Sequence, residues 1–178
     1  MRVEKRRATE AGFSLIELLI VVAVILVITA IAIPNFLQAR MAANETSAGA
    51  TMRTLNTVFH TYSSTYQNGF PAALDNLGPG PGGSSSCDQA GLIDSDLATT
   101  HIKSGYWFTY APGPALPAPG VGCTTAGVGD FQLNADPGPG GADRGRTGRK
   151  SFYMDTSGVI RYNMIAPAGP TDSPIPVG

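Results

Sequence analysis

Hydrophobic and polar positions divide this chain into three regions with different patterns. From Phe13 to Ile33 nearly every residue is apolar, and the only ionisable residue is Glu17. As an α-helix this run would be about 30 Å long, close to the thickness of the hydrocarbon core of a bilayer. We therefore predict a membrane-spanning helix over residues 13–34, preceded by a polar leader over residues 1–12.

Beyond Pro34 the helical pattern continues, but on one face only. Apolar residues recur there at steps of three and four: Ala48, Met52, Leu55, Phe59, Tyr62 and Tyr66. This spacing places them along a single stripe of a helix. Pro34 lacks a backbone donor, so we expect a kink there and not the end of the helix. The helix is predicted over about 13–67, with 35–68 as its amphipathic extension and Gly69 as the left-handed residue that ends it.

The remaining region, residues 69–178, alternates short strand patterns with loops rich in glycine and proline. Strands are predicted at 105–110 and at about 128–134, and a hairpin is predicted over 151–162 with its turn at 155–158. A sheet of three to four antiparallel strands is too small to be stable alone. We expect it to pack against the apolar stripe of the helix, which gives an α+β fold.

The connecting segments of this head region carry weaker signals. A short helical turn is predicted at 70–78, which has a proline near its start and a glycine at its end. Another turn is predicted at 92–97. The proline-rich tail, 166–178, is expected to be loosely ordered.

The carboxylate of Glu17 needs an explanation. Placing it near the bilayer interior costs roughly 2.5–3.5 kcal/mol, and simple anchoring does not require it. An ordinary secretory signal explains the run poorly, because its apolar region is about 7–15 residues long and ends at a small-residue cleavage site. An uncleaved membrane anchor is the alternative that length alone supports.

The sequence from Gly12 to Glu17 reads Gly-Phe-Ser-Leu-Ile-Glu, with a basic leader before it and an apolar run that ends at Pro34 after it. These features resemble the class III signal of type IV pilins and of the pseudopilins of type II secretion systems. The resemblance implies cleavage between Gly12 and Phe13 by a membrane-embedded prepilin peptidase, followed by methylation of the new amine of Phe13. It also implies an inner-membrane assembly platform with its ATPase, and a helical filament of identical subunits. The helix with its sheet head matches the same resemblance.

The chemistry of this motif is consistent with that interpretation. Phe13 and Glu17 are four residues apart and lie on one face of a helix. Cleavage would create a cation at position 13, at the positive end of the helix dipole, where a carboxylate is favourable. Glu17 would pair with the Phe13 amine of its own subunit or, as the resemblance suggests, of a neighbour. Removing one partner of a buried charge pair typically costs about 3–5 kcal/mol.

We interpret the chain as a structural subunit of a type IV pilus, stored in the inner membrane and polymerised outside the cell. The basic leader would stay cytoplasmic and the head periplasmic. The alternative is a pseudopilin of a type II secretion system, which shares every N-terminal feature. The hairpin sequence and the lack of a recognisable calcium loop favour the pilin. A third hypothesis, a singly anchored binding domain or enzyme, predicts an intact leader and a monomer.

Further candidate sites lie in the head. A single pair of cysteines in an exported segment, Cys87 and Cys123, predicts one disulfide, the alternative being two reduced and buried thiols. One loop is basic: Arg144, Arg146, Arg149 and Lys150. These residues could bind nucleic acid or another anionic surface, or form a solvated loop or a subunit contact. The formal net charge of the chain is −1, so the chain as a whole does not attract nucleic acid.

Catalysis and metal binding have little support in the sequence. His60 and His101 lack a second ligand at metal spacing, and no serine lies in a G-x-S-x-G motif. Loop aspartates that could hold calcium show no recognisable spacing: Asp94, Asp96, Asp130, Asp136 and Asp143. We predict no enzyme activity, no cofactor and no metal site. Asn44 begins a glycosylation sequon, but within the predicted helix.

Overall fold

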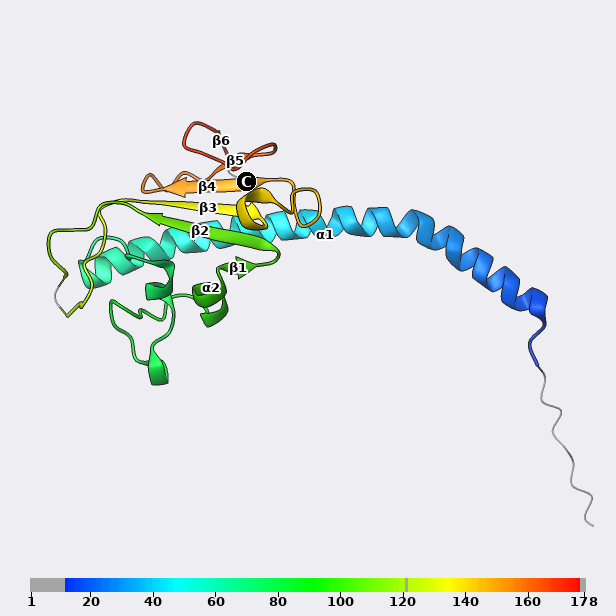
Figure 1. Cartoon of the computed structure of the whole chain (residues 1–178), viewed down its shortest axis with the longest axis horizontal. Helices are drawn as coiled ribbons and strands as arrows, with labels where there is room; N and C mark the ends of the chain where they lie inside the picture. Colours follow the sequence, from blue (N-terminus) through cyan, green and yellow to red (C-terminus); the bar gives the residue numbers. More distant parts are fainter. Residues whose placement is uncertain (1–11, 121, 177–178) are drawn as a thin grey trace, which may run out of the picture. The chain divides into compact units, whose positions relative to one another are not determined.

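The computed structural model describes residues 12–120 and 122–176 (Figure 1). The predicted leader, except for Gly12, lies outside the described residues. The chain divides into two compact units, Met1–Gln38 and Ala39–Gly178. One long helix, α1 (Leu15–Tyr66), supplies the described helical part of the first unit and continues into the second.

Helix α1 confirms the main sequence prediction, with small differences at its ends. Pro34 lies inside the helix and does not end it. The helix ends at Tyr66 because Gln67 takes a left-handed backbone, with φ of 47°. Gly69 is also left-handed, as predicted, but the chain has already left the helix there. A Cβ at Gly69 would come within 2.5 Å of the Val128 carbonyl oxygen, so glycine is required at this close approach.

Within the described residues six strands form one antiparallel sheet, in the order in which they occur along the chain. They are β1 (Ile102–Lys103), β2 (Tyr106–Pro112), β3 (Phe131–Pro137), β4 (Ser151–Asp155), β5 (Arg161–Asn163) and β6 (Ser173–Pro174). The sheet is larger than the three to four strands predicted, because β1 and β6 are two-residue strands too short to leave a sequence pattern. The predicted hairpin is confirmed as β4–β5, in which Tyr153 pairs with Arg161.

The second predicted strand begins later than expected. Val128 pairs with Phe70 and with Ala115 in isolated bridges, and regular pairing with β2 starts only at Phe131. The apolar character of Val128 therefore reflects burial against a loop and not membership of β3. The tail also differs from its prediction, since β6 lies within it and pairs with β5.

Of the two predicted helical turns, the one at 70–78 is shorter than expected, and the one at 92–97 is displaced by three residues toward the C-terminus. Besides α1, the described residues contain α2 (Ser95–Thr100) and three short 3₁₀ segments, η1 (Leu74–Leu77), η2 (Pro81–Gly83) and η3 (Pro139–Gly141). Helix α2 begins after Asp94 because that carboxylate accepts a 2.8 Å hydrogen bond from the Leu97 amide, a helix N-cap. The apolar residues before it pack on the core instead of belonging to the helix.

The apolar stripe of α1 forms one side of the core, and the strands β2, β3 and β4 lie alongside this part of the helix (Figure 1). Met52, Leu55 and Phe59 are fully buried. Their neighbours from the sheet include Phe108, Leu133 and Met154, which are also fully buried. The small sheet thus obtains its hydrophobic partner from the helix, as the sequence predicted.

Candidate assembly site

The beginning of α1 places Glu17 next to the predicted cleavage position. Ser14 precedes the first helical residue, and its backbone N–H donates to Glu17 Oε2 at 3.1 Å. This is one half of a capping box, in which a residue of the first turn satisfies an amide donor that the helix leaves free. Phe13 is 88% exposed. The carboxylate is therefore bonded to Ser14, the residue next to Phe13, whose amine cleavage after Gly12 would create.

The apolar part of α1 exposes its side chains throughout. Leu15, Ile25 and Ile31 are 81%, 53% and 66% exposed, and their apolar neighbours are similar. By length and composition, this helix is long and apolar enough to cross a membrane. Exposed apolar surface on this scale indicates contact with lipid or with other proteins. Pro34 lies on this helix among exposed residues, and its predicted kink stays a prediction.

Hydrogen bonds and one ion pair hold the basic loop, residues 144–150, on the head. Arg144 donates to the Arg149 carbonyl at 2.5 Å and to the Ser151 hydroxyl at 2.6 Å. Lys150 Nζ lies 3.4 Å from Glu45, whose other carboxylate oxygen accepts from the Arg149 amide at 2.8 Å. These contacts hold the loop against α1. The sequence grouped these cations by proximity but did not identify Glu45 as the partner of the Lys150 side chain and the Arg149 amide.

The remaining members of this loop are less constrained. Arg146 lies 3.5 Å from Asp143 and is 82% exposed, so this ion pair contributes little. The Arg149 side chain is exposed. Asn44, the sequon residue, donates to the Thr147 carbonyl at 2.8 Å, so its amide already has a structural role.

The two cysteines lie where one disulfide can close a large loop. The structure joins Cys87 to Cys123, with their Cα atoms 5.5 Å apart. Next to this bond, the Asp88 carboxylate accepts from the amides of Thr124 and Thr125 at 3.1 and 3.2 Å. The Thr124 hydroxyl, which donates to the same carboxylate, is the main cause of a lowered pKa of Asp88. No sequence pattern predicted that Asp88 would accept hydrogen bonds from Thr124 and Thr125.

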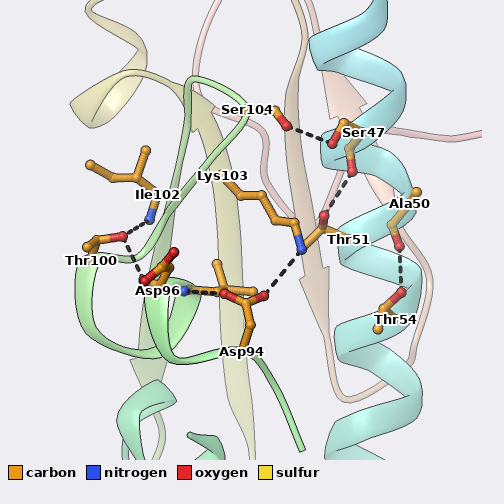
Figure 2. Close-up of polar contacts among 11 residues, drawn as sticks. Ser47, Ala50, Thr51, Thr54, Asp94, Asp96, Thr100, Ile102, Lys103 and Ser104 are labelled. Carbon is orange, nitrogen blue, oxygen red and sulfur yellow. Dashed lines mark hydrogen bonds and ion pairs between the residues drawn. The ribbon is translucent and has the colours of Figure 1, made fainter.

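A polar seam joins α1 to the segment from α2 to β1 (Figure 2). The hydroxyls of Ser47 and Ser104 lie 2.9 Å apart, and Lys103 Nζ lies 3.4 Å from Asp94. Both Lys103 and Asp94 are about half exposed, so their ion pair is weak. The seam positions the segment and shows no arrangement suited to catalysis.

The other candidate residues do not meet in one place. His101 pairs with Asp75 at 2.7 Å, and His60 is exposed on α1. Asp136 is buried beside Ser151, and burial raises its pKa, although the Ser151 hydrogen bond and the charge of Arg144 act in the opposite direction. Among the described residues no three acidic, histidine or cysteine side chains form a group that could hold a metal ion.

The described residues thus combine an exposed apolar helix, which carries a carboxylate in its first turn, with a following α+β head. Residues 7–33 match the family model described as the prokaryotic N-terminal methylation motif. This segment is the class III prepilin signal of the type IV pilins and pseudopilins, which are structural subunits. The signal implies processing by a prepilin peptidase, anchoring in the inner membrane and assembly into a filament. No curated protein and no solved structure matched the chain.

Proposed function

We propose that this chain is the structural subunit of a type IV pilus. It is held in the inner membrane with its head in the periplasm until the leader is removed between Gly12 and Phe13. The freed Phe13 amine is methylated, and the apolar helices then leave the lipid and pack together in the core of an extracellular filament. The observation that carries this proposal is the N-terminal methylation motif on a helix whose apolar side chains are exposed.

Glu17 has a specific part in this assembly. Exchange of lipid for sibling helices gains little hydrophobic free energy, because lipid tails are as apolar as leucine. A charge pair between Glu17 and a Phe13 amine therefore selects the register at which subunits add. The Ser14 hydrogen bond supports this role, since it keeps the carboxylate at the helix end where that amine appears. The energy for extraction from the membrane comes from the ATPase of the assembly platform.

The first test is mass spectrometry of the N-terminal peptide from the native host. The expected peptide begins at Phe13 and carries one additional methyl group on its amine. A protein that still begins at Met1, with no filaments on the cells, contradicts the proposal.

The second test separates the charge of Glu17 from its capping function. Glu17→Gln keeps an oxygen that accepts from the Ser14 amide but removes the charge, whereas Glu17→Leu removes both. If pairing with the amine drives assembly, both variants insert in the membrane and yield few filaments. Filament yield in Glu17→Gln equal to that of the unaltered protein would show that capping alone matters. A membrane-fraction immunoblot is the control for insertion.

The alternative, a pseudopilin of a type II secretion system, shares the methylation motif. Deleting the gene distinguishes the two functions. A pilin deletion removes surface filaments and leaves protein secretion intact, and a pseudopilin deletion does the reverse.

A further inference from the structure

The disulfide joins two segments that a carboxylate also joins, directly beside the sulfur atoms. Cys87 lies between η2 and α2, and Cys123 lies in the long connection between β2 and β3. One oxygen of Asp88 accepts from the Thr124 amide at 3.1 Å and from the Thr124 hydroxyl at 2.5 Å. The other oxygen accepts from the Thr125 amide at 3.2 Å. We call these three hydrogen bonds the Asp88 bridge.

Each of the two segments is also held by residues at the end of α1. The Tyr62 hydroxyl donates to the Cys87 carbonyl at 2.8 Å. Asn68 holds the other segment, since its Nδ2 donates to the Thr125 carbonyl at 3.0 Å and its Oδ1 accepts from the Gly127 amide at 3.1 Å. Both segments are thus anchored near the same end of the helix, and the Asp88 bridge joins one segment to the other.

The bridge places the two cysteines where a disulfide can form. Their Cα atoms are 5.5 Å apart, within the usual range for a disulfide. Bringing two thiols together from a flexible chain costs conformational entropy. If hydrogen bonds already hold the two segments in the reduced protein, oxidation loses less entropy and its equilibrium constant rises. By thermodynamic linkage, the disulfide strengthens the bridge by the same factor.

The two sulfur atoms differ in their access to an oxidant. Cys87 is buried, with 2% of its surface exposed, whereas Cys123 is half-buried. Exchange between a thiolate and a disulfide requires direct access of the attacking sulfur, so it begins at the more exposed cysteine. Cys123 is therefore the position at which an external disulfide can react first.

We propose that Asp88 is a positioning residue for the oxidation of Cys87 and Cys123, and that Cys123 reacts first. The Cys123 thiolate attacks the disulfide of an oxidant, which is oxidised glutathione or an oxidising dithiol–disulfide protein. This step forms a mixed disulfide and releases one thiolate of the oxidant. The Cys87 thiolate then attacks the Cys123 sulfur, which closes the protein disulfide and releases the second thiolate. Two thiol protons and two electrons leave the protein, and the electrons reduce the oxidant to two thiols.

The positioning role is tested at equilibrium, with the full chain in detergent. The protein is incubated at neutral pH in mixtures of reduced and oxidised glutathione, and the disulfide is quantified by alkylation and mass spectrometry. Asp88→Ala should lower the effective concentration of the two thiols by about five- to tenfold, the low end of typical coupling between linked sites. Asp88→Asn should lower it less, because the amide keeps one acceptor oxygen but presents a donor to the second amide.

Asp94→Ala is the matched control. Asp94 also accepts from a backbone amide, that of Leu97 at 2.8 Å, but it caps α2 and bonds neither cysteine segment. Its loss weakens the head without moving the thiols apart, so the effective concentration should not change. Trp107 fluorescence verifies that each variant is folded. An unchanged effective concentration in Asp88→Ala overturns the positioning role. An equal fall in Asp94→Ala also overturns it, because a general loss of stability then explains the result.

Single-cysteine variants test the order of attack. Cys87→Ala leaves the Cys123 thiol and Cys123→Ala leaves the Cys87 thiol. A small aromatic disulfide that releases a coloured thiolate should react several-fold faster with Cys123 than with Cys87 in the folded proteins. In urea, where neither thiol is buried, the two rates should become similar. Equal rates in the folded proteins, or faster reaction of Cys87, overturn the proposed order.

Discussion

Loss of the disulfide should lower the free energy of unfolding of the head, because the unfolded chain would be less restricted. The folded structure should change little. Cys87 and Cys123 are 36 residues apart. In the chain-entropy description, closing a loop of this length stabilises the folded state by about 4 kcal/mol at 25 °C. That is a large fraction of the 5–15 kcal/mol by which typical domains are stable.

The folded state has other contacts that keep the two ends of this loop together. Asp88 is bonded to Thr124 and Thr125, and the Tyr62 hydroxyl donates to the Cys87 carbonyl at 2.8 Å. The fold should therefore survive removal of the bond. The free energy of unfolding should fall close to the full loop-entropy value, since these contacts act only in the folded state.

The test uses Cys87→Ala, Cys123→Ala in the full chain in detergent, unfolded with urea. Trp107 is the single tryptophan and lies in β2, so its fluorescence reports on the head alone. With slopes of about 1–3 kcal/mol per molar urea, the midpoint should fall by more than about 1 M. Reductant should lower the midpoint of the unaltered protein equally and leave the variant unchanged. A loss below about 1 kcal/mol, or no response to reductant, would refute this account.

Three further predictions concern the head. Leu55→Ala, at a fully buried position, should cost about 2–5 kcal/mol in the same urea assay. Asp94→Ala removes the N-cap of α2 and should cost about 1 kcal/mol, whereas Lys103→Ala, which only breaks the exposed ion pair, should cost less. Because burial raises the pKa of Asp136, ionising it opposes folding: the head should lose stability as pH rises from about 4 through that raised pKa. Asp136→Asn should flatten this pH dependence, and an unchanged profile would contradict it.

The parts of the fold that sequence predicted are those with a local cause. The stripe of α1 has a single period over many residues, and the β4–β5 hairpin combines two apolar runs with a turn. The start of β3 could not be predicted, because Val128 is apolar for a non-local reason, its pairing with Phe70. Strand β6 was missed because two residues carry no alternation.

In the candidate site too, residues with a local sequence signal were predicted and residues joined only by the fold were not. Glu17 was identifiable because a carboxylate in an apolar run is costly whatever the fold. The surroundings of the basic loop were not, since Glu45 lies about a hundred residues away in sequence and reaches Arg149 only in the folded head. Spacing along the chain could group the cations but could not assign partners to them.

Loops rich in glycine and proline would ordinarily make a poor surface for specific assembly, because ordering them on contact costs entropy. Here side chains have already ordered them. Asn68 accepts from the amides of Gly120 and Gly127, and Asp88 and Asp172 collect donors from two other loops in the same way. Polar side chains of the head therefore serve to fix the ends of its loops by hydrogen bonding to loop amides. A filament built from such heads would obtain ordered contact surfaces without needing a larger sheet.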